Sequence, residues 1–216
     1  ITDGNTRFLD VTVTTVAEEP LQPSYWLQFD EQSQTLHGLP LESDIVMGQA
    51  VFIITATNSL GATTSRQFQI NIDKNSIEDI SHEFQTTFAI RHQNIEISRL
   101  YLISLVNRIT NYFGDDDSDA MSVTSIQNGS VILRWTNNTI SKSNCMNDTI
   151  AQLYSRLYVD DRINPSFRGA MEPDFPVSDV KLTYRGICAE FASTPSPSTT
   201  DNTDNSTIIL IAVLIP

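Results

Sequence analysis

The sequence has few basic residues. Lys and Arg together number 13 of 216 residues, against 26 Asp and Glu, so the formal net charge is −13. A nucleic-acid-binding surface needs clustered Lys and Arg, and this balance argues against one. The sequence also lacks a phosphate-binding glycine loop. We therefore expect no nucleic-acid partner and no cofactor.

Histidine is scarce as well. His37, His82 and His92 are the three histidines, and none has the spacing of a metal-binding motif such as H-E-x-x-H. We expect each of them to be solvated or to cap backbone groups. The sequence contains no G-x-S-x-G motif, and no nucleophile has a visible base partner. An extracellular hydrolase is therefore disfavoured, and we expect no turnover of other substrates.

A metal site is not indicated either. The acidic run GDDDSDA (114–120) places aspartates at offsets resembling those of a calcium-binding loop. However, Ala120 stands where the sharp turn needs Gly, and Ile126 stands where a bidentate Glu is required. Runs of aspartate are usually solvated loops, and we expect no metal ligands here.

No apolar run is long enough for a complete membrane span. The last apolar run covers residues 208–216, whereas a spanning helix needs about 20 residues. Residues 192–206 are rich in Ser, Thr, Pro and Asn, which predicts a disordered stalk. Because a stalk precedes the run, we expect 207–216 to be the start of a truncated transmembrane helix. The alternative is that this run forms an apolar tail or a last strand.

Cysteine is limited to Cys145 and Cys188. In an oxidising compartment they would form a disulfide, and otherwise they would be two buried thiols. The compartment is indicated by four N-glycosylation sequons, which matter only in a secreted chain. They begin at Asn128, Asn137, Asn147 and Asn205. Their number favours an extracellular setting and hence the disulfide.

Residues 1–74 have the pattern of short strands. RFLDVTV alternates apolar and polar residues, and AVFIITAT and RQFQINI flank a turn-like NSLGATT. Short strands with this spacing and no helical period predict an all-β sandwich. We expect this domain to be N-terminally truncated.

Residues 78–191 have a different pattern. An alternating strand, HEFQTTFAI, precedes a helical stripe formed by Leu102, Leu105, Val106, Ile109 and Phe113. A hairpin, a second helix over NDTIAQLYSRLYVDD and a last strand, DVKLTY, follow. The order strand, helix, strand, strand, helix, strand predicts an α+β, ferredoxin-like domain.

The hairpin turn raises a chemical question. Asn-Gly between apolar runs is a strong signal for a tight hairpin, and Asn128-Gly129 is followed by Ser130. If the fold twisted the Gly129–Ser130 peptide, amide resonance would weaken and the serine hydroxyl could attack the carbonyl carbon. Turn chemistry alone favours a plain turn, because no adjacent histidine is evident to activate the serine.

The stretches GSVILRWTNNT (129–139) and NPSFRGAMEPDF (164–175) resemble the self-cleavage region of the dystroglycan family. YWLQFDEQSQTLHGLP and ITATNSLGA, in the first block, are similar to the cadherin-like domain of that family. The resemblance extends over nearly the whole chain, in the same order. It implies a cadherin/Ig-like domain followed by a SEA-like domain.

The resemblance also implies roles for individual residues. The precursor would cleave itself between Gly129 and Ser130 into an outer α subunit and a membrane-bound β subunit that stay associated without a covalent bond. Asn137 would carry an N-glycan, and Cys145 would pair with Cys188. A glycan on Asn128 would crowd the cleavage site.

The resemblance further implies a place for the chain in the cell. It would be the juxtamembrane ectodomain of a single-pass type I adhesion receptor of the plasma membrane, which links extracellular matrix to cytoskeleton. Implied partners are laminin-type G domain proteins, through glycans outside this sequence, dystrophin, through a tail outside it, and sarcoglycans. The rival hypothesis is an uncleaved cell-surface protein-binding module.

Overall fold

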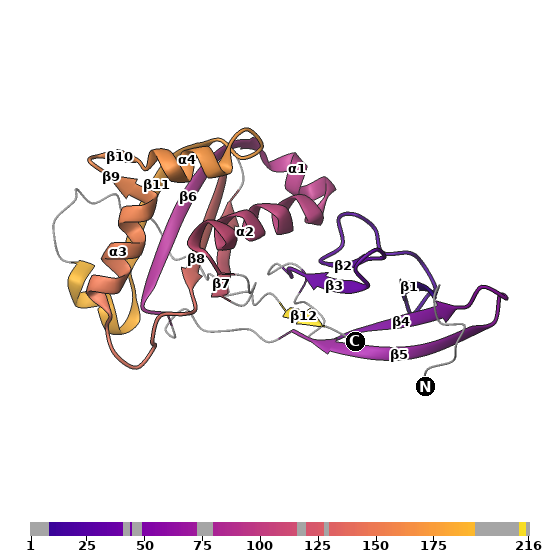
Figure 1. Ribbon diagram of the computed structural model, residues 1–216. Coiled ribbons are helices and arrows are strands. Elements are labelled where there is room, and N and C mark those ends of the chain that lie inside the picture. Colours follow the sequence, from indigo (N-terminus) through magenta and orange to yellow (C-terminus); the bar gives the residue numbers. More distant parts are fainter. Residues whose placement is uncertain are drawn as a thin grey trace.

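The computed structural model describes residues 9–40, 44, 49–72, 80–115, 120–127, 130–192 and 212–214. These residues are mostly β-sheet, with several helices, and they form two blocks (Figure 1). The strands described in the first block are β1 (Asp10–Thr15), β2 (Leu27–Asp30), β3 (Thr35–Gly38), β4 (Gln49–Thr57) and β5 (Thr63–Asn71).

The first block has two small antiparallel sheets. One has the order β1-β4-β5, and the other contains β2 and β3. Both sheets contribute to one hydrophobic cluster, in which the rings of Trp26 and Phe52 meet edge to face with centroids 5.8 Å apart. The alternating runs form strands because burying one face of each sheet in this cluster removes apolar surface from water.

The second block follows the strand and helix order expected from its sequence pattern, with additions. Its elements are β6 (His82–Arg91), α1 (His92–Ile97), α2 (Arg99–Phe113), β7 (Met121–Gln127), β8 (Ser130–Asn137), α3 (Asn147–Leu157), β9 (Tyr158–Val159), β10 (Arg162–Ile163), α4 (Pro165–Met171), β11 (Val177–Tyr184) and the 3-10 helix η4 (Gly186–Ala192). Helix α4 lies in a segment whose sequence predicts a loop. Its start is explained by Asn164, whose side chain accepts a hydrogen bond from Ser166 N, and by Pro165 at the first helical position.

The sheet of the second block has the order β11-β6-β8-β7, and every neighbouring pair is antiparallel. Helix α2 has the predicted apolar stripe and ends at Gly114, whose φ of 81° is the left-handed conformation that favours glycine. The helices pack against one face of the sheet (Figure 1). In this strand order, β8 is an interior strand with β6 on one side and β7 on the other.

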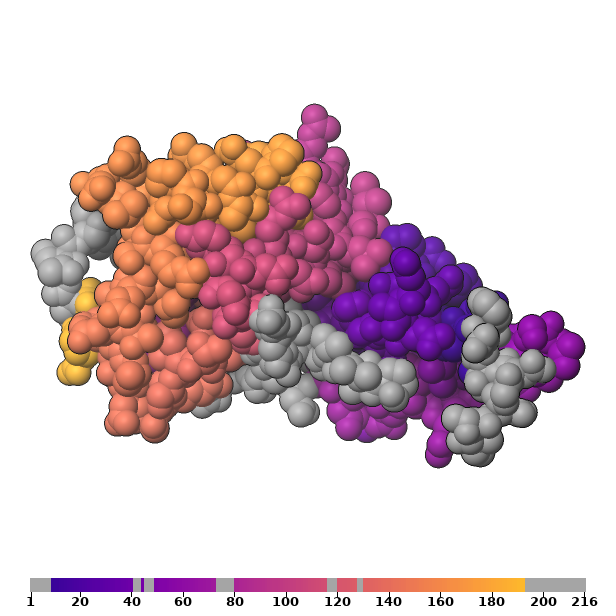
Figure 2. Space-filling view, in the orientation of Figure 1, coloured from indigo at the N-terminus to yellow at the C-terminus, as the bar shows by residue number. Residues whose placement is uncertain are grey.

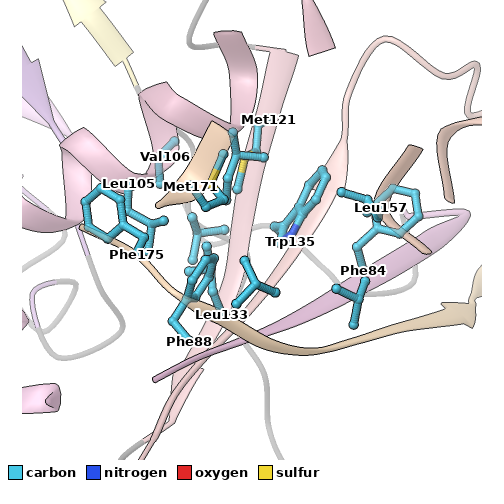
Figure 3. Close-up of a cluster of buried hydrophobic side chains, with 14 of the residues drawn as sticks. Phe84, Phe88, Leu105, Val106, Met121, Leu133, Trp135, Leu157, Met171 and Phe175 are labelled. Atoms are coloured by element: carbon cyan, nitrogen blue, oxygen red, sulfur yellow. The ribbon is translucent and has the colours of Figure 1, made fainter. Parts of the chain in front are cut away.

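The main core lies between this sheet and its helices. Buried side chains from β6, α2, β7, β8, α3 and α4 gather there, including Phe84, Leu105, Met121, Trp135 and Leu157 (Figure 3). Successive residues of a strand point to opposite faces. Accordingly Val131, Leu133 and Trp135 are buried in this core, while the intervening residues of β8 face the other side.

The two blocks are in direct contact. Leu39, which follows β3, is fully buried and belongs to the core cluster of the second block. Arg99, at the start of α2, donates from its backbone N to Pro23 O at 2.7 Å and from Nη1 to Leu39 O at 3.2 Å. Its Nη2 also lies 3.4 Å from Asp44 Oδ2. In the space-filling view the first block adjoins the helical side of the second (Figure 2).

The C-terminal apolar run contains a described strand. Ala212–Leu214 form β12, which pairs antiparallel with β3, whereas we expected the start of a transmembrane helix over 207–216. An unpaired strand edge readily takes up a further apolar segment. In the part of the chain that the structure describes, no helix is long and apolar enough to cross a membrane.

Candidate functional site

Ser130 is the first residue of β8, and its side chain is exposed. Asn128 and Gly129 lie outside the described residues. In the sheet, Ser130 pairs with Arg91, the last residue of the neighbouring strand β6. The expected nucleophile therefore stands at the beginning of an interior strand.

The register of the β7–β8 hairpin differs from the expected tight turn. The last registered pair is Gln127 with Ile132, whereas a two-residue Asn-Gly turn would pair Gln127 with Ser130. The hairpin is present with this wider register, and the predicted turn at Asn128-Gly129 itself lies outside the described residues. A bulge between Val123 and Ser125 shifts the register of β7, and the packing of β8 against β6 outweighs the local turn preference.

Strand β6 also has an irregular register beside Ser130. Phe88 pairs with Val131, and the next registered pair is Arg91 with Ser130. Ala89 and Ile90 are thus extra residues on β6. Ala89 N donates instead to Pro176 O at 2.8 Å. Strand β6 therefore changes register next to Ser130, whereas the bulge of β7 lies opposite Arg134 and Trp135, farther along β8.

Strand β8 is firmly held beyond this point. Val131 and Leu133 are fully buried, and Trp135 Nε1 donates to Thr86 Oγ1 at 3.2 Å. Ile132 is half-buried on the other face. Burial of a Val or Leu side chain contributes about 1.5 to 3 kcal/mol, so β8 is anchored immediately after its exposed first residue.

Two of the histidines, His82 and His92, have distinct surroundings. His82 is fully buried, and its Nε2 accepts a hydrogen bond from Asn137 N at 3.1 Å. Burial lowers the pKa of His82 to about 4, so it is neutral at physiological pH. Of the two alternatives expected for the histidines, His82 is therefore not solvated but caps a backbone group. His92 Nδ1 lies 3.2 Å from Glu96 Oε1.

Cys145 and Cys188 form a disulfide. Cys145 lies just before α3, and Cys188 lies in η4 after the last strand of the sheet. Both cysteines follow Ser130 in the chain. The disulfide therefore cannot connect the segments before and after the Gly129–Ser130 bond.

The sequons are only partly described. Asn137 is 5% exposed, and its Oδ1 accepts hydrogen bonds from Thr139 N at 2.8 Å and from Thr139 Oγ1 at 2.5 Å. Asn147 is half-buried at the start of α3. Asn128 and Asn205 lie outside the described residues. Glycans at these four positions stay predictions. Because Asn137 is buried in the folded domain, a glycan there would have to be attached before the domain folds.

Comparison with protein families agrees with the order of the two blocks. A family model described as dystroglycan domain 4 matches residues 82–190, which is half of the chain. The chain belongs to the dystroglycan family. A second model, the alpha-dystroglycan third Ig-like domain, matches residues 1–73. The resemblance noted in the sequence is thereby confirmed.

Membership of the dystroglycan family has direct consequences. The chain is a dystroglycan-type receptor ectodomain with an Ig-like first block. Dystroglycans are adhesion receptors and not enzymes, which indicates a cell-surface location and partners of the adhesion-receptor kind.

Proposed function

We propose that this chain is the juxtamembrane ectodomain of a dystroglycan-like receptor, which links extracellular matrix to cytoskeleton and matures by cleaving itself between Gly129 and Ser130. The observation that carries the proposal is the position of Ser130, exposed at the start of an interior strand whose neighbour β6 changes register beside it. Such irregularities are frequent next to active sites.

The same proposal assigns the finer fold. The first block is a cadherin/Ig-like sandwich (1–74), and the second is a SEA-like, ferredoxin-like domain (78–191). The observed strand order supports the second assignment, because β11-β6-β8-β7 is the fourth, first, third and second of the main strands in chain order. That order is the one produced by a split βαβ unit. The stalk (192–206) and a membrane span starting at 207 complete the assignment, and this span would require residues 212–214 to leave their pairing with β3.

The reaction balances without a cofactor. Ser130 Oγ attacks the carbonyl carbon of Gly129, the Gly129–Ser130 C–N bond breaks, and an ester forms. The hydroxyl proton goes to the departing nitrogen, which becomes the α-amine of Ser130. Water then hydrolyses the ester, leaving a carboxylate on Gly129 and a free hydroxyl on Ser130. Each chain cleaves once, so the protein is not an enzyme toward other substrates.

The sheet explains how the two products stay together. The outer fragment carries β6 and β7, and the inner fragment carries β8 and β11. Strand β8 pairs with β6 and β7 on its two sides, and β11 pairs with β6. Separating the fragments requires breaking these three pairings, as well as the pairing of β12 with β3, and exposing the buried side of β8.

Further partners follow from family membership. By the family resemblance, laminin-type G domain proteins bind glycans outside this sequence, dystrophin binds a cytoplasmic tail outside it, and sarcoglycans associate alongside. The chain then lies on the extracellular side of the plasma membrane, as part of a single-pass type I protein.

An uncleaved protein-binding module is the second candidate function. It is favoured by an open groove of about 760 Å³ between the two blocks. The groove is lined by Phe29, Asp30, Glu31, Gln32, His37, Leu100, Ile103, Ser104, Asn107, Arg108 and Asn111. Binding there and self-cleavage are compatible, so only the state of the Gly129–Ser130 bond separates the two hypotheses.

A denaturing gel of the secreted ectodomain tests the proposal. We expect two fragments, residues 1–129 and 130–216, with or without reductant. Ser130→Ala should leave one intact chain, because the nucleophile is gone. Fragments that persist in Ser130→Ala would indicate an external protease, and an intact wild-type chain would favour the uncleaved module.

A further inference from the structure

The groove between the two blocks has two walls of different chemistry. One wall is the end of β2 and the turn that follows it, which contribute Phe29, Asp30 and Glu31, and the other wall is helix α2. Figure 1 shows β2 and β3 beside this helix. Binding sites often lie at domain interfaces, and the groove volume of about 760 Å³ is within their usual range. The groove therefore has both the position and the size of a binding site.

The α2 wall is a stripe of mostly polar side chains. Ser104, Asn107 and Asn111 recur three or four residues apart, so they lie on one face of the helix, and Leu100 extends this stripe by one turn. The hydroxyl and amide oxygens can accept hydrogen bonds, and Leu100 offers exposed apolar surface. This wall therefore suits a side chain that combines an apolar stem with hydrogen-bond donors.

Arg108 also lines the groove, but its charge is already compensated. Its Nη2 lies 2.8 Å from Asp174 Oδ2, and its Nη1 donates to Met171 O at 3.2 Å. Its guanidinium also lies over the ring of Phe175. These contacts hold Arg108 against the end of α4 and the segment that follows, so it adds little positive charge to the groove.

The opposite wall carries two carboxylates without a cationic partner. Asp30 and Glu31 are exposed, and no described residue forms an ion pair with either of them. Hydrogen bonds from Ser33 and from the backbone N–H of Gln32 hold the pKa of Asp30 below its usual value. Asp30 is therefore ionised at physiological pH, and this side of the groove is negatively charged.

We propose that the groove binds a basic segment of a partner protein through an arginine side chain. A guanidinium has five donors and a fixed positive charge. These match the carboxylates of Asp30 and Glu31 on one wall and the oxygens of Asn107 and Asn111 on the other. The aliphatic stem of the arginine lies along Leu100. The proposal names the kind of partner that the groove takes, and it holds whether or not the chain cleaves itself.

The probe for this site is a pentapeptide with two central arginines between apolar residues. Isothermal titration calorimetry measures its affinity for the full wild-type chain and for the full Ser130→Ala chain. We expect the same affinity for both, because Ser130 does not line the groove. A second peptide with citrulline in place of arginine keeps the shape and loses the charge, and it should bind at least tenfold more weakly.

Two variants test the two walls in the Ser130→Ala chain. Asp30→Asn together with Glu31→Gln should weaken binding of the arginine peptide at least tenfold, and the new asparagine keeps the oxygen that accepts the turn hydrogen bonds. Ser104→Trp should abolish binding, because the indole fills the groove without changing its charge.

The matched control is Glu18→Gln together with Glu19→Gln. This change removes two exposed carboxylates from the loop after β1, outside the groove, and lowers the net negative charge by the same amount. The control chain should bind the arginine peptide as its parent does. An equal weakening in the control would assign the binding to the overall charge of the protein and overturn the inference.

Three further outcomes would overturn it. The first is absence of arginine-peptide binding, and the second is equal binding of the citrulline peptide, which would indicate a groove for neutral ligands. The third is an unchanged affinity in Ser104→Trp or in the Asp30 and Glu31 variant, at the melting temperature of the parent chain. Self-cleavage is measured separately on the denaturing gel, so failure of peptide binding leaves the proposed function intact.

Discussion

His82 joins two strands through a single buried contact. Its ring sits on β6, fully buried, and accepts the backbone N–H of Asn137 at the end of β8. Desolvation lowers its pKa from 6.5 to about 4. The folded protein therefore holds a neutral imidazole, and protonation would both bury a charge and remove the acceptor.

This burial predicts a pH dependence of stability. Between pH 6.5 and pH 4 the unfolded chain binds a proton at His82 that the folded chain does not, so stability falls as the pH falls through that window. At pH 5 we expect a loss of roughly 2 kcal/mol relative to pH 8. Urea unfolding of the Ser130→Ala chain at both pH values measures it.

The control for His82 is His82→Gln, which can still accept a hydrogen bond but does not titrate. Its urea midpoint should change much less between pH 8 and pH 5 than that of the parent chain. An equal change in both chains would assign the pH dependence to other groups.

Single residues also show what the sequence could predict at the site. The local Asn-Gly-Ser pattern draws attention to Ser130, but that pattern alone favours a plain turn, and the predicted role of Ser130 in cleavage comes from the resemblance to the dystroglycan family. The pairing of Ser130 with Arg91 could not be predicted, because it depends on two extra residues in β6, a strand distant in sequence.

At the level of elements, the disulfide fastens the helical end of the inner fragment. It connects the segment before α3 to η4, across 43 positions of sequence. A crosslink of this separation contributes about 4 kcal/mol in chain-entropy terms. It restrains α3 against the end of β11 without joining the two fragments.

Removing the disulfide should therefore destabilise the fold. In the Ser130→Ala chain, replacing both cysteines by alanine should lower the free energy of unfolding by about 2–4 kcal/mol, measured by urea titration. Met146→Ala, which alters an exposed neighbour, should have little effect. Equal stability of the double variant and its parent would contradict this role.

The elements also differ in how well their sequences predict them. Helix α2 follows from its apolar stripe and Gly114, because these signals lie within the helix. The sequence predicts a loop where helix α4 lies. This helix has only seven residues, with one Pro and one Gly among them, which are too few to show a helical periodicity of apolar residues. The turn at Asn128 was predicted from local chemistry, but packing of β8 between its neighbours decides the register.

At the level of the whole molecule, the two blocks share a core residue. Leu39 comes from the first block, yet it is buried in the cluster of the second. Arg99 holds the adjoining backbone through hydrogen bonds to Pro23 and Leu39. No sequence pattern predicted this contact, because Leu39 lies in a Gly-Leu-Pro sequence that is typical of an exposed turn.

Leu39→Ala should accordingly destabilise the second block. We expect a loss of about 2–4 kcal/mol, typical of a buried leucine. Trp135 reports on the second block by fluorescence once Trp26 is replaced by Phe, since the chain has 2 tryptophans. Leu60→Ala, at a residue 81% exposed, is the control. An unchanged Trp135 transition in Leu39→Ala would mean that the blocks fold independently.

The central claim is that the chain cleaves itself and that its sheet then holds the fragments together. Native and denaturing mass spectrometry of the purified wild-type ectodomain, without reductant, measures both parts at once. We predict one native mass, equal to the whole chain plus one water molecule. Under denaturing conditions we predict two masses, for residues 1–129 and 130–216. A single unbroken chain under denaturing conditions, or fragments that end elsewhere, would contradict the claim.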